Sequence, residues 1–177
     1  MRRLTALEPE QAPDKSREVL NEIIGRRGSV GEMVSTMAHS PALLEGYLSF
    51  SRAMKKVKIP RPLSEKISLA VQEWIGCAMC REAHTAGARA AGLSESDIAL
   101  ARQGTSTDAR EAALIGVAVR VLVEPSSLTD EDVAGLREHG WSDRVIAEVV
   151  GLVTLNLLTG AFNLLAGIEP KAATPAS

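Results

Sequence analysis

Aromatic residues are scarce in this chain, with two Trp, one Tyr and two Phe scattered over 177 residues. An excess of one charge is also lacking, because the formal net charge is −2 and acidic and basic residues are interspersed. Proteins that bind nucleic acids carry a basic surface, and those that bind single strands add aromatic side chains for base stacking. The sequence therefore predicts no nucleic-acid partner.

Alternating β-branched residues bounded by turn dipeptides, the usual signal of a strand, are absent. Ala, Leu, Glu and Arg instead recur every three or four residues, separated by Ser, Asp, Gly and Pro. This pattern predicts an all-α fold, a helical bundle of about eight helices. We expect helices over residues 14–26, 41–56, 64–75, 77–92, 108–123 and 129–138, a short one from residue 94 and a long one from residue 142.

A chain of 177 residues can bury a stable core without disulfides or structural metals. We expect a single domain over residues 1–177, with a central helix hairpin between two groups of helices. The N-terminal helices would lie in 13–60, the hairpin in 63–92 and the C-terminal helices in 94–168, followed by a frayed tail over 169–177.

Residues 151–168 contain no charged side chain and are just long enough to span a membrane. The segment also contains glycines and several polar residues, including Asn156 and Asn163, and no basic cluster flanks it, so it would make a poor span. We expect instead a core helix or one shared with another subunit, and no membrane partner.

Cys77 and Cys80 are the two cysteines of the chain, and His84 follows four residues after the second. If Gly76 ends one helix and the next begins near Cys77, the two Cα atoms lie about 5 to 6 Å apart, within disulfide range. Unpaired backbone N–H groups at a helix N-terminus favour thiolate over thiol, and His84 would lie one turn further on the same face. The spacing therefore predicts a reactive thiolate with a resolving partner.

Two other interpretations of this pair remain open. A metal site would use Cys77, Cys80 and His84, but zinc usually takes four ligands, and His39 and His139 lie in distant segments. Free cysteines can also be inert core residues. A C-x-x-C pair without other cysteines is typical of a reducing compartment, and residues 1–10 lack the apolar stretch of a signal peptide, so we expect a cytoplasmic protein.

The segment from Leu63 to Val71, the Gly76-Cys77, Cys80 and His84 pattern, and Ala91-Gly92-Leu93-Ser94 together resemble the alkylhydroperoxidase D-like branch of the carboxymuconolactone decarboxylase superfamily. Similarity extends from about Met33 to Pro170. The resemblance implies an all-helical, homo-oligomeric thiol peroxidase with antioxidant, peroxiredoxin-type activity on hydroperoxides. Whether the oligomer is a dimer, trimer or hexamer stays open. We expect no bound cofactor or metal, and an external dithiol, such as a lipoyl or thioredoxin-like protein, as the reductant.

The resemblance also implies four catalytic residues. Glu65, through His84 and a water, would deprotonate Cys80, and Cys77 would resolve the resulting sulfenic acid. On one unbroken helix Glu65 and Cys77 would lie about 18 Å apart, so this relay requires the chain to reverse at Gly76. Glu73 is a rival base, because it precedes Cys77 by four residues and would share its face on a continuous helix.

Two further questions stay open from the sequence. Helix polarity alone would favour Cys77 rather than Cys80 as the attacking sulfur. A dithiol redox sensor or disulfide-exchange partner would use the same cysteine pair without needing a peroxide site.

Overall fold

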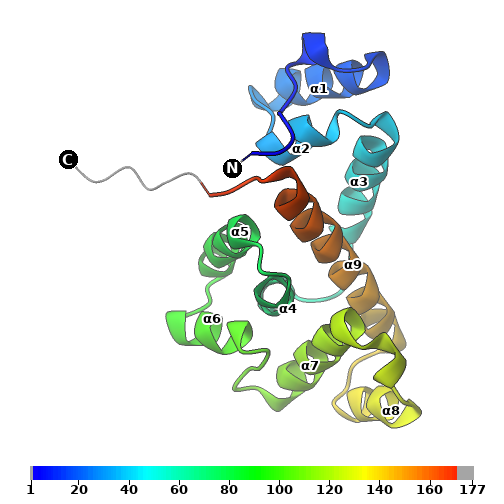
Figure 1. Ribbon diagram of the computed structural model, residues 1–177. Coiled ribbons are helices and arrows are strands. Elements are labelled where there is room, and N and C mark those ends of the chain that lie inside the picture. Colours follow the sequence, from blue (N-terminus) through cyan, green and yellow to red (C-terminus); the bar gives the residue numbers. More distant parts are fainter. Residues whose placement is uncertain (1, 171–177) are drawn as a thin grey trace, which may run out of the picture. The chain divides into compact units, whose positions relative to one another are not determined.

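The computed structural model describes residues 2–170, and the part of the predicted tail beyond Pro170 lies outside them (Figure 1). Within these residues the chain forms nine α-helices and two short 3-10 helices, with no strand, which confirms the all-α prediction. The α-helices are α1 (Asp14–Arg27), α2 (Glu32–Met37), α3 (Pro41–Met54), α4 (Arg61–Ile75), α5 (Ala78–Ala90), α6 (Glu95–Arg102), α7 (Ala109–Val123), α8 (Asp130–Glu138) and α9 (Asp143–Ala166).

The chain divides into two compact units, and the single domain expected over 1–177 stays a prediction. Of the described residues, 54–161 form one unit, and the other combines residues 2–53 with residues 162–170. In the latter, Leu20 of α1, Met37 of α2 and Leu44 of α3 are fully buried. The sequence pattern missed α2, because its six residues are too few to show a helical period.

Helix α4 is the centre of the 54–161 unit, where it contacts α5, α6 and α7 (Figure 1). Its buried side chains serve two clusters. Ile67 and Val71 belong to a core shared with α7, α8 and α9, whereas Leu69 packs with Ala88 of α5 and with α6. A helix with apolar residues on more than one side is expected at the middle of a helical domain.

The start of α4 differs from the prediction. The sequence placed it at Ser64, after Pro60 and Pro62, but the helix begins at Arg61 with Pro60 as its N-cap. Pro62 therefore lies inside the first turn. Backbone N–H groups of the first turn have no partner within the helix, so a proline there costs no hydrogen bond.

Buried polar contacts fix α4 against its neighbours. The Lys66 ammonium, almost fully buried, pairs with Glu111 of α7 at 2.6 Å. On another side, the Gln72 amide donates to the backbone carbonyl and the side-chain oxygen of Asn156 in α9, at 2.9 and 3.0 Å. A buried polar group left unpaired costs about 1–3 kcal/mol, so these contacts specify how the helices pack.

Helix α9 is long and apolar enough to span a membrane by length and composition. The central helix of a folded domain passes the same test, and α9 supplies Val149 and Val153 to the core of the 54–161 unit. Its length alone is therefore weak evidence for a membrane location.

We predict that Gly160→Ala in α9 destabilises the protein by about 1–3 kcal/mol, because the new methyl group would overpack the core. A Cβ atom at Gly160 would lie 2.7 Å from Oε1 of Gln72 and 2.9 Å from Cγ2 of Ile75. Urea unfolding measures the change.

Gly116 of α7 provides the matched control, since a Cβ atom there meets nothing within 4 Å. Alanine is the better helix former, so Gly116→Ala should be neutral or stabilising by up to about 1 kcal/mol. Equal effects of the two substitutions would contradict the packing at Gly160.

Candidate active site

The cysteine pair lies where two helices meet. Gly76 ends α4 in the left-handed conformation, with φ of 79°, and Cys77 is the N-cap of α5. The Cys77 sulfur accepts a hydrogen bond from the backbone N–H of Cys80 at 3.2 Å. A left-handed residue strongly favours glycine, so Gly76 allows α5 to begin immediately after the turn.

Cys77 and Cys80 form a disulfide, with their Cα atoms 5.3 Å apart as the spacing predicted. Both residues are buried, with exposed fractions of 1% and 6%. In the reduced state, the unpaired N–H groups and positive dipole end of α5 would favour a thiolate here.

Glu65 and His84 meet across α4 and α5. His84 Nδ1 lies 2.8 Å from Glu65 Oε2, and the carboxylate side chain is only 17% exposed. His84 also lies one turn after Cys80 on α5, so helices α4 and α5 together carry the four sequence-predicted residues, Cys77, Cys80, His84 and Glu65. A carboxylate that fixes one ring nitrogen orients the imidazole and its tautomer.

Gly87 makes this contact sterically possible, and sequence reasoning missed it. A Cβ atom at Gly87 would lie 2.7 Å from Oε1 and 2.8 Å from Cδ of Glu65. Glycine inside a helix destabilises it by about 0.5–1 kcal/mol relative to alanine. A glycine within a predicted helix, three residues after His84, was therefore the signal that the sequence offered.

Glu73, the rival base, has a different partner. Its carboxylate pairs with Arg81 of α5 at 2.7 Å. Each of the Glu73–Arg81 and Glu65–His84 contacts joins a residue before Gly76 to one after it, and the first pair is nearer to Gly76 in the sequence. This order is expected where the chain turns back on itself. The Glu73 carboxylate is thus engaged by a guanidinium, whereas Glu65 is the carboxylate that contacts His84.

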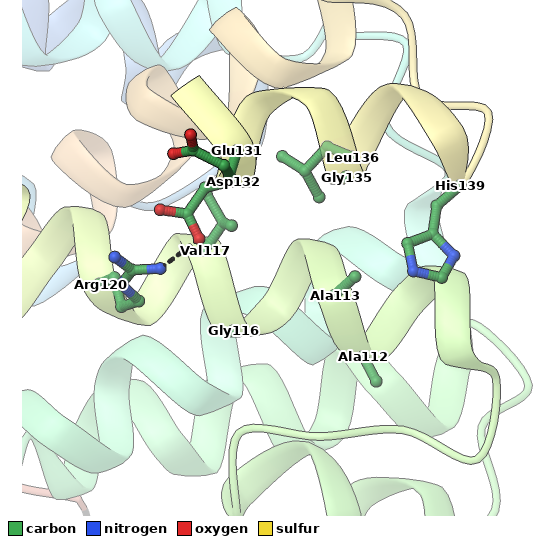
Figure 2. A pocket seen from close by; sticks show the side chains of 10 residues that line it. All are labelled: Ala112, Ala113, Gly116, Val117, Arg120, Glu131, Asp132, Gly135, Leu136 and His139. Carbon is green, nitrogen blue, oxygen red and sulfur yellow. Dashed lines mark hydrogen bonds and ion pairs between the residues drawn. The ribbon is translucent and has the colours of Figure 1, made fainter. Parts of the chain in front are cut away.

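A pocket of about 360 Å³ between α7 and α8 contains none of the predicted site residues (Figure 2). Gly116 and Gly135 lie along it and His139 lies at one end. Near the other end, hydrogen bonds from Arg120 are the main cause that lowers the pKa of Asp132. This ion pair joins the two helices.

Within residues 2–170, no three His, Cys, Asp or Glu side chains gather in a group that could hold a metal ion. The histidine and cysteines of the candidate site are engaged with Glu65 and with each other.

Comparison with known families gives a match over residues 41–124 to the carboxymuconolactone decarboxylase family. That range spans α3 to α7 and includes all four predicted catalytic residues. The chain thus matches this family over just under half of its length. No curated protein matches the sequence.

Solved structures similar to this chain share its fold at low sequence identity. An alkylhydroperoxidase AhpD core protein from Ralstonia eutropha JMP134, described as peroxidase-related, has 21% identity and a TM-score of 0.81, over 97% of this chain and 93% of its own. A peroxidase-related protein from Silicibacter sp. TM1040 has 19% identity and a TM-score of 0.77, over 95% and 92%. The fold is thus that of the alkylhydroperoxidase D-like branch, which confirms the resemblance seen in the sequence.

A protein with a different chemistry also has this fold. A cysteine-to-alanine variant of the debrominase Bmp8, in complex with 2,3,4-tribromopyrrole, has 18% identity and a TM-score of 0.74, over 96% of this chain and 91% of its own. Fold similarity alone therefore does not identify the substrate of this chain.

We predict that the effect of Gly87→Ala depends on Glu65. In the otherwise unchanged protein, Gly87→Ala should lower the free energy of unfolding by about 1 kcal/mol or more, because the methyl group displaces the carboxylate from His84. In a Glu65→Ala background the space is empty, and the same substitution should stabilise by up to about 1 kcal/mol.

A double-mutant cycle in urea measures this coupling, with Ala86 to glycine in the same helix as a control for helix propensity alone. Additive effects of Gly87→Ala and Glu65→Ala would contradict the proposed fit between the two residues.

Proposed function

We propose that this protein is a thiol peroxidase that reduces hydroperoxides by cycling Cys77 and Cys80 between dithiol and disulfide. The observation that carries the proposal is the disulfide at the N-terminus of α5, one turn from a histidine held by a buried carboxylate. The match of residues 41–124 to the carboxymuconolactone decarboxylase family and the fold shared with peroxidase-related proteins support it.

In the first step the Cys80 thiolate attacks one oxygen of the hydroperoxide and the O–O bond breaks. The other oxygen leaves as an alkoxide, takes a proton supplied through His84 and Glu65, and becomes the alcohol. Cys80 is then a sulfenic acid. The Glu65–His84 hydrogen bond of 2.8 Å supports this assignment, because it holds the imidazole one turn from the attacking sulfur.

In the second step the Cys77 thiol condenses with the sulfenic acid, which forms the disulfide and releases water. An external dithiol then reduces the disulfide by exchange and is itself oxidised. We propose a lipoyl or thioredoxin-like protein for this role and a cytoplasmic location, where such reductants operate. Over the cycle, one hydroperoxide and one dithiol become one alcohol, one water and one disulfide.

Reductive debromination is the second candidate, because a debrominase shares this fold. It would also oxidise two thiols to a disulfide, with the organic substrate losing bromide and gaining hydrogen. A dithiol sensor would form the disulfide without sustained turnover. Steady-state assays with a dithiol reductant, using cumene hydroperoxide and tribromopyrrole in parallel, separate the three functions.

We predict that Cys77→Ser accumulates sulfenic acid on Cys80 after one equivalent of hydroperoxide, because its resolving thiol is gone. Cys80→Ser should not form a sulfenic acid. Trapping with a dimedone-type reagent followed by mass spectrometry measures both. The opposite pattern, with the adduct in Cys80→Ser alone, would make Cys77 the attacking sulfur.

We predict that Glu65→Gln lowers kcat/KM for hydroperoxide by about 100-fold or more, the size expected for loss of an acid–base group. Glu73→Gln is the matched control, since Glu73 pairs with Arg81 instead. Its kcat/KM should stay within about fivefold of the original protein, as expected for loss of a partly exposed ion pair. A larger loss of kcat/KM in Glu73→Gln than in Glu65→Gln would make Glu73 the base.

We also propose that the protein is a homo-oligomer. Trp74 of α4 is 64% exposed, and Val150 and Leu157 of α9, two turns apart on one helix face, are about half exposed. Apolar side chains of this size outside a core often mark an interface between subunits. Sedimentation velocity should show a dimer, trimer or hexamer, and Leu157→Glu should weaken the association of the subunits. A monomer at all protein concentrations would contradict the proposal.

A further inference from the structure

A pocket of about 200 Å³ lies between α1 and α3, and all of its lining residues belong to the unit that contains residues 2–53. We refer to it as the α1–α3 pocket. Its lining comprises Lys15, Ser16, Val19 and Glu22 of α1, and Pro41, Leu44, Glu45, Leu48 and Arg52 of α3. Sites for drug-sized ligands have volumes of about 300–1,000 Å³, so this pocket has room only for a smaller molecule.

Ser16 contributes a buried hydroxyl without a partner to the wall of this pocket. Its exposed fraction is 0%, and among residues 2–170 its Oγ forms no hydrogen bond. Residues 15, 16, 19 and 22 follow the spacing of one helix face, so Ser16 lies on the side of α1 that faces α3. Rotation about one bond, χ1, can direct the hydroxyl to a ligand in the pocket. A buried polar group left unpaired costs about 1–3 kcal/mol, so a ligand that accepts a hydrogen bond from Ser16 would remove this penalty.

The uncharged part of the lining is otherwise apolar. Val19 of α1 and Pro41, Leu44 and Leu48 of α3 contribute to it, and Leu44 is fully buried. Burial of one methylene group against such side chains stabilises a complex by about 0.8 kcal/mol. The pocket therefore favours a ligand with a short aliphatic chain.

Positive charge exceeds negative charge among the unpaired groups of the lining. Among residues 2–170, Lys15 and Arg52 form no ion pair. The Glu22 carboxylate pairs at 2.5 Å with Arg26, which lies outside the lining. Two unpaired cations therefore oppose one remaining carboxylate, that of Glu45, which favours an anionic ligand.

The start of α1 adds to this preference. Its N-cap is Pro13, which makes no side-chain hydrogen bond to the helix. Backbone N–H groups of a first turn have no partner within the helix, and they form the positive end of its dipole. Lys15 and Ser16 lie in this first turn, so the dipole also favours an anion that contacts both residues.

We propose that the α1–α3 pocket binds a short-chain monocarboxylate at the first turn of α1. Ser16 donates a hydrogen bond to the carboxylate, Lys15 neutralises its charge, and the aliphatic chain lies against Leu44. A neutral alcohol would lack the attraction to the cations, and inorganic phosphate would leave the apolar part of the pocket unfilled. Because Cys77 and Cys80 belong to the other unit, this inference is independent of the peroxidase function.

Calorimetry of the full-length protein with hexanoate, 1-hexanol, hexylamine and inorganic phosphate tests the class of ligand. Hexanoate should bind about tenfold or more tightly than each of the other three, because only hexanoate carries both a negative charge and an aliphatic chain. Equal binding of hexanol would show an apolar site that makes no use of the charges, and equal binding of phosphate would show an anion site only. Either result, or no binding of hexanoate, would overturn the proposal.

Lys15→Gln and Ser16→Ala test the position of the carboxylate, and each should weaken the binding of hexanoate about tenfold. Arg27→Gln and Ser35→Ala are the matched controls. Arg27 is exposed at the end of α1, Ser35 is buried in α2, and neither lines the pocket. Both controls should bind hexanoate as the original protein does. Equal affinities of all four variants for hexanoate would contradict the assigned position.

Urea unfolding checks that Ser16→Ala keeps its fold, and it tests the unpaired hydroxyl separately. The substitution should leave the free energy of unfolding unchanged or raise it, because it removes a buried polar group without a partner. Hexanoate should then stabilise the original protein more than it stabilises Ser16→Ala. A clear loss of stability in Ser16→Ala without ligand would mean that the hydroxyl already has a partner, and would contradict the site.

Discussion

The Glu65 carboxylate, held against His84 in the space left by Gly87, is the contact on which the candidate site depends. It joins the first half of α4 to the middle of α5, and the chain can return to make it only because Gly76 adopts a left-handed conformation. The same turn makes Cys77 the N-cap of α5. One backbone reversal thus places Cys77 at the N-terminus of α5 and brings Glu65 against His84.

Helix α4 can fulfil this role because it is held on several sides. Lys66, next to Glu65, is paired with α7, and Gln72 is hydrogen-bonded to α9. Such buried polar contacts are costly to break, so they oppose sliding or rotation of the helix. The Glu73–Arg81 pair adds a link across the turn and occupies the carboxylate that would otherwise compete as a base.

Much of this arrangement could be predicted from the sequence, because its signals are local. The C-x-x-C spacing, the Gly76 stop and the i+4 position of His84 together predicted disulfide distance and a turn before α5. Three features could not be predicted: α2 is too short to show a period, Pro62 lies in a first turn where it is tolerated, and Gly87 has its role only through Glu65 on another helix.

The central claim is that the two sulfurs exchange electrons with a hydroperoxide, and a stoichiometric titration tests it most directly. Fully reduced protein is mixed with one equivalent of cumene hydroperoxide, free thiols are counted by alkylation and mass spectrometry, and the alcohol product is quantified. We expect each chain to lose both thiols as a disulfide between Cys77 and Cys80 while one molecule of alcohol forms. Unchanged thiols with intact hydroperoxide would contradict the account.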